Sequence, residues 1–147
     1  MRGTATYEPA VTGIPESRER GSARDTIDVR LSGGPEAPSR ARRALQRLRG
    51  DLDPPLMETM RLLVTELVSN SVRHASAEAV SLRVLVGRQA VLVEVRDHGP
   101  GFEPRPRRRT DARDSGWGLF LVERLANRWG VGREGRGTRV WFELRRG

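Results

Sequence analysis

The sequence contains no cysteine and no lysine. The absence of cysteine excludes disulfides, thiolate metal sites, iron–sulfur clusters and cysteine nucleophiles. The absence of lysine excludes P-loop NTPases, eukaryotic-type protein kinases and Schiff-base enzymes, because each of these classes depends on a lysine side chain. All 27 basic residues are therefore arginines, and any phosphate that this protein binds must be held without a lysine.

Long apolar runs are also missing from the sequence. No segment approaches the roughly 18 apolar residues of a transmembrane helix, so we expect no membrane span. The first residues are polar and charged, without the apolar core of a secretory signal, so we expect no such signal. These features fit a cytoplasmic protein, and 147 residues fit one domain with a core of its own.

The net charge of +8 would in general favour a nucleic-acid partner. However, the heavy use of arginine, glycine, alanine and proline, with only two isoleucines and two asparagines, is typical of a high-GC bacterial genome. We therefore give the charge little weight as an indication of nucleic-acid binding.

Hydrophobic periodicity predicts a mobile N-terminal tail over residues 1–24 and one domain over residues 25–147. The expected elements are strand 26–31, helix 38–49, helix 54–74, strands 80–86 and 91–97, helix 117–128, and strands 129–134 and 138–144. Gly50 is expected to stop the first helix and Asp53 to cap the second. Because most strands come as hairpins, we expect an α+β fold, a two-layer sandwich with a mixed, mostly antiparallel sheet and three helices on one face.

Residues 99–116, between the expected strand 91–97 and the expected helix 117–128, show no apolar periodicity. Proline, arginine and aspartate make up most of Glu103–Asp114. We expect a long exposed loop here, and loops of about 15 residues within a compact domain are usually functional or disordered.

The first of three notable clusters lies on the second helix. Glu66, Asn70 and His74 are four residues apart and share one strip of the helix, with Arg73 beside them. A solvated helix face is the ordinary explanation for a lone glutamate or asparagine. Asparagine is a poor helix former, however, so its position in mid-helix calls for a specific role.

The other two clusters contain glycine. Asp97-x-Gly99-x-Gly101 follows a strand, and Gly116-x-Gly118-Leu119 precedes a helix. Each is compatible with a plain turn or helix start, but glycines also let the backbone approach a ligand closely. A helix N-terminus in addition offers free N–H groups to an anion.

In this order and spacing, the three clusters resemble those of the superfamily of gyrase, histidine-kinase and heat-shock-chaperone ATPases, with its Bergerat nucleotide-binding fold. The N box corresponds to Glu66–Ala75, the first glycine box to Asp97–Gly101 and the second to Ser115–Leu119. The resemblance covers roughly residues 26–145. It identifies the long loop, at about residues 102–115, as an ATP lid.

The resemblance implies ATP and Mg²⁺ as ligands. Asn70 would bind Mg²⁺ through its side-chain oxygen, a ligand type that this ion prefers. Asp97 would accept a hydrogen bond from the adenine amine, supported by Thr138. The residues that the resemblance assigns to the nucleotide, including those that would bind phosphate or hinge the lid, are Asn70, Arg73, His74, Asp97, Gly99, Gly101, Phe102, Gly116, Trp117, Gly118, Leu119 and Thr138.

Within this superfamily, the run Gly137-Thr138-x-Val-Trp-Phe-Glu-Leu is most similar to bacterial anti-sigma-factor serine/threonine kinases. That family implies a protein that holds a sigma factor and releases it for an anti-anti-sigma (STAS-type) partner, whose serine or threonine it phosphorylates. Glu66 would then be either the general base or the group that orients the acceptor hydroxyl. The resemblance also suggests a homodimer, whereas the longer N-terminal tail and the arginine-rich lid depart from the family pattern.

Two alternatives stay open. A regulatory module could bind ATP and partners without phosphotransfer, although the presence of both Glu66 and Asn70 argues against this alternative. A nucleic-acid binder could use the lid arginines, Arg105 and Arg107–Arg109. Aromatic side chains do not interleave with these arginines, so a solvated charge run explains them better.

Overall fold

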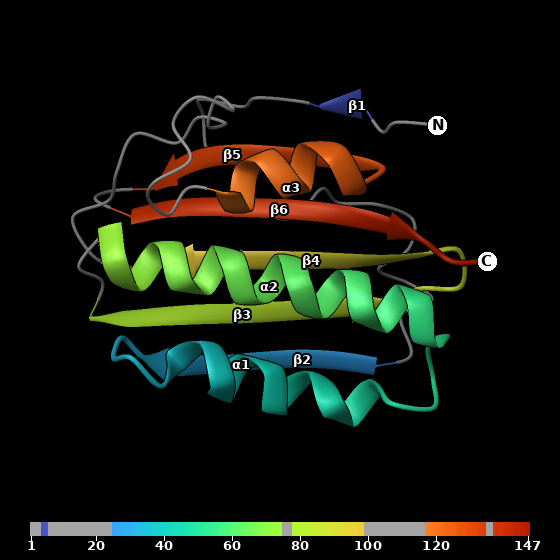
Figure 1. Ribbon diagram of the computed structural model, residues 1–147, viewed down its shortest axis with the longest axis horizontal. Helices are drawn as coiled ribbons and strands as arrows, with labels where there is room; N and C mark the ends of the chain where they lie inside the picture. Colours follow the sequence, from blue (N-terminus) through green and yellow to red (C-terminus); the bar gives the residue numbers. More distant parts are fainter. Residues whose placement is uncertain (1–3, 6–24, 75–77, 99–116, 135–136) are drawn as a thin grey trace.

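The computed structural model describes residues 4–5, 25–74, 78–98, 117–134 and 137–147. Its strands are β1 (Thr4–Ala5), β2 (Asp25–Ser32), β3 (Ala79–Val86), β4 (Ala90–Asp97), β5 (Arg128–Glu134) and β6 (Gly137–Arg145). They form one sheet in the order β1-β5-β6-β4-β3-β2 (Figure 1). β1 runs parallel to β5, and the other neighbouring pairs are antiparallel.

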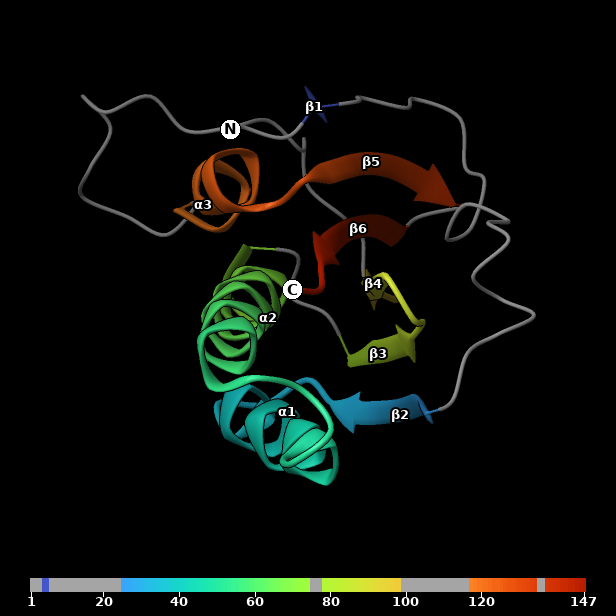
Figure 2. The same cartoon turned by 90° about the vertical axis from the view of Figure 1, so that its right-hand side faces the viewer.

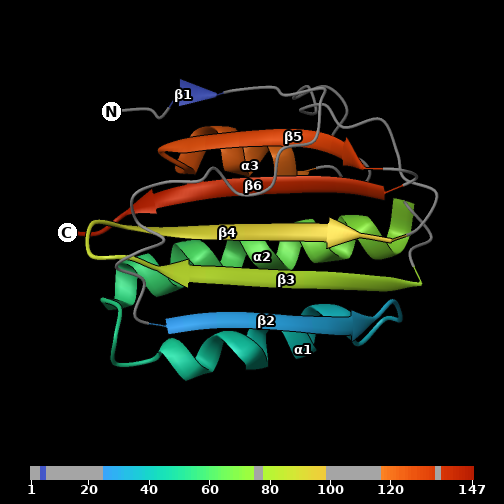
Figure 3. The same ribbon diagram turned by 180° about the vertical axis from the view of Figure 1, so that it is seen from behind.

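Three α-helices cover one face of this sheet. They are α1 (Ala37–Leu45), α2 (Pro54–His74) and α3 (Trp117–Leu125). The side view shows them as one layer against the strands (Figure 2), and the view from behind shows the sheet in front of them (Figure 3). The predicted two-layer α+β fold, with a mostly antiparallel sheet and three helices on one face, is confirmed. Among the described helices, none is long and apolar enough to cross a membrane.

The hydrophobic core lies between the two layers because alternate strand residues face the helices. On β4 these residues are Val91, Val93 and Val95, all of which are buried. The central helix, α2, supplies the opposing stripe, with buried Met60, Leu63, Val64, Leu67 and Val68. This stripe recurs every three or four residues and fixes which face of α2 turns away from the core.

The turn between α1 and α2 has the two local signals that the sequence predicts. A short 3₁₀ helix, η2 (Gln46–Leu48), follows α1, and Gly50 then adopts a φ of 97°. This left-handed backbone favours glycine. Asp53 Oδ2 accepts the Leu56 N–H at 3.4 Å, which caps the start of α2. The expected cap at Asp53 is confirmed, and Gly50 follows the helical stretch as expected, although the α-helix itself already ends at Leu45.

Two helix ends differ from the prediction. The first helix ends as an α-helix at Leu45 and continues only as η2, and the third ends at Leu125 instead of near Arg128. The reason for the second difference is a contact distant in sequence. The Asn127 N–H donates to the Glu143 carbonyl, and Asn127 Oδ1 accepts the Arg145 N–H at 2.7 Å, so the chain joins the sheet there.

The N-terminal region differs from the prediction at two residues. Thr4 and Ala5 pair with Arg128 and Trp129 as β1, within the segment predicted to be a mobile tail. This pairing satisfies backbone groups of β5 that would otherwise form an open sheet edge. Residues 6–24 lie outside the described residues, so for them the tail remains a prediction.

The sheet face opposite the helices carries buried charge. Glu94 Oε2 lies 3.4 Å from Arg139 Nε, and Glu94 Oε1 lies 3.7 Å from Arg96 Nη2. Both Glu94 and Arg139 are buried, as is Trp141 on the same face. Burial of either charge without the other would be costly, so the two side chains depend on each other.

The backbone at Gly50 yields the first prediction. Gly50→Ala should lower the free energy of unfolding by about 1–2 kcal/mol, because an L-residue is strained at positive φ. A Cβ at Gly50 would meet no atom within 4 Å, so the loss would come from the backbone alone. Urea denaturation measures the change. Gly34→Ala is the control and should be nearly neutral, since the nearest atom to its added Cβ is 3.9 Å away; equal losses in both variants would contradict the prediction.

Candidate nucleotide-binding site

Four element ends meet at one end of the molecule. The C-terminal ends of α2 and β4 and the N-terminal ends of α3 and β6 lie together at the left of Figure 1. This arrangement follows from the topology, because β4 and β6 are antiparallel neighbours and α2 packs on the sheet from the helix layer. The described parts of the three clusters singled out in the sequence therefore lie in one region.

Asn70 is the buried polar residue of α2 at this end. It is 3% exposed, and the next residue, Ser71, is buried with its Oγ donating to the Leu67 carbonyl at 3.1 Å. An amide in such a position is not part of an ordinary solvated helix face, because burial of a polar group is costly unless it is used. Its side-chain oxygen has the chemistry of a Mg²⁺ ligand.

Glu66 precedes Asn70 by one helical turn and is partly exposed. Residues four apart on a helix have Cβ atoms about 5–6 Å apart, so the two side chains share a strip of α2. Glu66 thus lies one turn from the buried amide at a partly exposed position, where it can contact a molecule that arrives from solvent.

Asp97 and Thr138 form the other buried polar pair. Asp97, the last residue of β4, is 2% exposed, and its Oδ1 accepts the Thr138 N–H at 3.3 Å. The antiparallel pairing of β4 with β6 produces this contact, since the preceding residue of β4, Arg96, is paired with Arg139. The structure thus brings Thr138 next to Asp97 through a backbone hydrogen bond, and the role of the pair towards adenine stays a prediction.

The Thr138 hydroxyl is the strongest indication of a ligand. Within the part of the chain that the structure describes, Thr138 Oγ1 is buried and has no hydrogen-bond partner. Buried polar atoms are nearly always satisfied, and an exception next to a buried carboxylate suggests a polar group that is not part of the protein. A purine amine and ring nitrogen, which donate and accept side by side, fit this pair of oxygens.

His98 shows how the end of β4 is held. Its Nε2 lies 2.8 Å from Ser81 Oγ, and its N–H donates to the Ala79 carbonyl at 3.1 Å. Both contacts tie the residue after Asp97 to β3. β3 therefore holds the backbone next to Asp97, while the Thr138 N–H of β6 holds its carboxylate.

The remaining predicted residues divide into two groups. Leu119 is buried in the hydrophobic core, so its side chain anchors α3 and leaves the backbone of the nine-residue helix for contacts at its start. Arg73 is exposed near the end of α2. The positions outside the described residues are Gly99, Gly101, Phe102 and Gly116, together with most of the predicted lid, and of His74, Trp117 and Gly118 only the place in the helix is described.

The sequence-based reasoning gave no role to Ser71, which the structure buries beside Asn70. The signal that could have identified it is a serine directly after a mid-helix asparagine, on the edge of an apolar stripe. The lack of a hydrogen-bond partner for the Thr138 hydroxyl could not have been predicted, because it depends on which side chains the fold brings near this residue.

Comparison with known proteins identifies the family of this domain. The profile of the histidine kinase-like ATPase domain family matches residues 31–144, and the chain belongs to this family. It is therefore an ATPase-type, ATP-binding domain with the Bergerat fold. No curated protein sequence matches the chain.

One solved structure with this fold is the crystal structure of the RsbU and RsbW domains of Rv1364c from Mycobacterium tuberculosis. The TM-score is 0.62 at 19% sequence identity, and the match covers 84% of this chain. It covers 33% of the mycobacterial chain, so this protein spans about a third of that relative's length. At this identity the match establishes the shared fold.

The unpaired hydroxyl yields the second prediction. Thr138→Val should leave the stability of the nucleotide-free protein unchanged or slightly higher, because removal of an unsatisfied buried hydroxyl costs little. The same variant should bind ATP about 5- to 10-fold more weakly, since a net hydrogen bond contributes about 1 kcal/mol. Thermal denaturation and calorimetric titration measure the two quantities.

Thr65→Val is the matched control. Thr65 lies on α2 away from the site, and its Oγ1 donates to the Arg61 carbonyl at 2.7 Å. The Thr65→Val variant should leave ATP affinity unchanged. If Thr138→Val destabilised the free protein by 1–3 kcal/mol, the usual cost of breaking a buried hydrogen bond, Thr138 Oγ1 would have a partner within the protein.

Proposed function

We propose that this protein is a bacterial, cytoplasmic anti-sigma-factor serine/threonine kinase that uses Mg-ATP to phosphorylate an anti-anti-sigma partner of the STAS type. The observation that carries the proposal is the pair of buried polar positions, Asp97 with Thr138 and Asn70, at the meeting point of α2, β4 and β6. Family membership supports ATP as the nucleotide. The likeness to a structure containing an RsbW domain supports a partner-switching regulator, in which a sigma factor and its antagonist compete for the protein.

The residues have separate tasks in this proposal. Asp97 accepts a hydrogen bond from the adenine amine, which selects ATP over GTP, and Thr138 Oγ1 binds the adjacent ring edge. Asn70 Oδ1 holds Mg²⁺, which supplies charge neutralisation for the phosphates. Arg73 and His74 line the phosphate side, together with the backbone of the Gly116–Leu119 segment at the start of α3.

Glu66 is the proposed general base. In phosphotransfer, the partner's serine or threonine oxygen attacks the γ-phosphorus of the substrate ATP, the bond to the β–γ bridging oxygen breaks and ADP leaves. The proton of the attacking hydroxyl passes to the Glu66 carboxylate. The partly exposed position of Glu66, one turn from Asn70, supports this task because the acceptor arrives from solvent.

Two substitutions on α2 form the third prediction. Glu66→Gln keeps the size of the side chain but removes the base, so ATP should bind at nearly wild-type strength while phosphotransfer falls by about 10²–10⁴. Asn70→Ala removes the metal ligand, so both Mg²⁺-dependent ATP affinity and phosphotransfer should fall. The assay is transfer of labelled phosphate from ATP to candidate STAS-type proteins, with calorimetry for ATP binding.

Glu58→Gln is the matched control on the same helix, since Glu58 is 76% exposed and lies two turns before Glu66. Glu58→Gln should change neither the ATP affinity nor the rate of phosphotransfer. A Glu66→Gln protein that phosphorylates its acceptor at the wild-type rate would show that Glu66 is not the base. A wild-type protein that binds ATP and phosphorylates none of the candidates would favour the alternative, a regulatory module that acts by binding alone.

A further inference from the structure

The outer face of the sheet, opposite the helices, contains a buried apolar cluster of its own. Leu85, Leu92 and Trp141, on β3, β4 and β6, are 6%, 2% and 1% exposed. They form a group that is separate from the main core between the sheet and the helices. We call these three residues the outer-face cluster.

The described helices do not account for this burial. All three α-helices lie on the other face of the sheet (Figure 2), and the free face of an antiparallel sheet is commonly solvated. The β2 edge of the outer face is indeed solvated, since Asp28 and Arg30, which alternate with core-facing residues, are exposed. The cover of the outer-face cluster therefore lies over the middle of the sheet and does not come from these helices.

Strand pairing places the cluster between the two ends of one chain segment. β1 and β2 form opposite edges of the sheet (Figure 1), and residues 6–24 connect them in the sequence. One row of paired residues crosses the whole sheet: Thr4, Arg128, Glu143, Leu92, Leu85 and Thr26. The segment starts after Ala5 and ends before Asp25, so both of its ends adjoin this row, with Leu92 and Leu85 between them.

The connecting segment is long enough to cross the outer face. β1 and β2 are five strand spacings apart, which is about 24 Å at roughly 4.8 Å per spacing. The 19 residues from 6 to 24 reach up to about 63 Å when extended. A path on the other side is longer, because the chain would have to pass outside α1, α2 and α3 (Figure 2).

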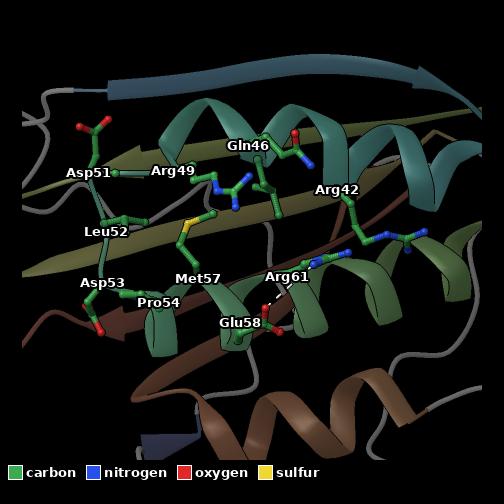
Figure 4. Close-up of a pocket in the computed structure, with 12 residues that line it drawn as sticks. Arg42, Gln46, Arg49, Asp51, Leu52, Asp53, Pro54, Met57, Glu58 and Arg61 are labelled. Carbon is green, nitrogen blue, oxygen red and sulfur yellow. Dashed lines mark ion pairs between the residues drawn. The ribbon is translucent and has the colours of Figure 1, made fainter.

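The sequence of the segment suits an apolar surface. It contains Tyr7, Val11 and Ile14, and its two prolines, Pro9 and Pro15, favour extended backbone in the residues before them. The concave surface on the helix side, between α1 and α2, has three arginines and three carboxylates among its lining residues (Figure 4). That surface is a poorer match for the apolar side chains of the segment than the outer-face cluster is.

We propose that residues 6–24 cross the outer face of the sheet and cover the outer-face cluster with their apolar side chains. In this proposal the segment is a docked part of the domain and not the mobile tail that the sequence predicts. The contact adds apolar burial to the domain and keeps an apolar face from meeting other molecules. The docking does not depend on nucleotide binding, so its test needs no ATP.

The absence of cysteine makes single engineered thiols a direct probe of this cover. Leu92→Cys places a thiol in the outer-face cluster, and Val93→Cys places one in the main core, at the next residue of the same strand. Asp28→Cys is the reference for an exposed position on the outer face. The rate of reaction with an uncharged pyridyl disulfide is measured on the full chain and divided by the rate in urea, because thiol reactivity depends on exposure.

Two charge-matched double variants of the segment are then combined with each thiol. Val11→Asp with Ile14→Asp is the cover variant, since a carboxylate is costly in an apolar contact. Thr12→Asp with Ser17→Asp is the control, with the same change in net charge in the same segment.

With the natural segment, Leu92→Cys should react at least about tenfold more slowly than Asp28→Cys. The cover variant should raise the rate of Leu92→Cys at least about tenfold and leave Val93→Cys slow, whereas the control should stay within about threefold of the natural segment. Loss of protection at residue 92 alone distinguishes removal of the cover from opening of the whole domain.

Reaction of Leu92→Cys as fast as Asp28→Cys in the full chain would overturn the proposal, and so would an unchanged rate in the cover variant. Equal acceleration at residues 92 and 93 in a folded cover variant would overturn it as well. Ile14→Asp alone replaces the double variant if circular dichroism shows that the latter is unfolded. Protection that disappears on dilution of the protein would assign the cover to a second copy of the chain and not to residues 6–24.

Discussion

The site depends on the satisfaction of one buried carboxylate. Asp97 lies at the last position of β4, where the sheet buries it almost completely, and an uncompensated carboxylate there would be costly. The antiparallel pairing of β4 with β6 brings the Thr138 N–H to its Oδ1, and the contacts of His98 with β3 hold the backbone behind it. The same strand pairing that builds the sheet therefore also orients the carboxylate.

Next to this carboxylate, a second buried oxygen, Thr138 Oγ1, has no hydrogen-bond partner among the described residues. A buried hydroxyl without a partner, next to a buried carboxylate, is expected where a ligand supplies the missing contact.

The long central helix connects this site to the rest of the molecule. Its apolar stripe packs on the sheet over most of its length, so its two ends cannot move independently. Asn70 and Glu66 lie towards its C-terminal end, so the packing of the stripe holds both positions against the sheet.

Much of the fold was predictable because its signals are local. The bounds of α2 follow from the cap at Asp53 and from an apolar stripe that runs without interruption to the N box. The end of α3 was not predictable in this way, since Asn127 leaves the helix to pair with β6, a contact distant in sequence. Arg139 and Trp141 alternate with the core-facing residues of β6, yet both are buried, and an ion pair with Glu94 compensates the arginine.

The site residues likewise divide into those that a sequence motif predicts and those that only the fold brings together. Asn70, Asp97 and Thr138 were predicted through a resemblance carried by their motifs, and the structure buries all three. The arginines that line the concave surface between α1 and α2, Arg42, Arg49 and Arg61, had no such motif and could not be distinguished in the sequence from a compositional excess of arginine. Only the fold, which brings residue 61 next to residues 42–49, gives them a common surface.

The role of Asp97 in reading adenine is tested most directly by calorimetric titration of wild type and Asp97→Asn with ATP and with GTP, in the presence of Mg²⁺. Wild type should bind ATP more tightly than GTP. Asp97→Asn should lose about 1–3 kcal/mol of ATP binding, or roughly 5- to 150-fold in affinity, because a buried hydrogen bond to a charged group is replaced by a mismatched amide. Asp28→Asn, at an exposed position on β2, should bind both nucleotides as wild type does. Unchanged ATP affinity in Asp97→Asn would contradict the assignment of this end of the sheet as the adenine site.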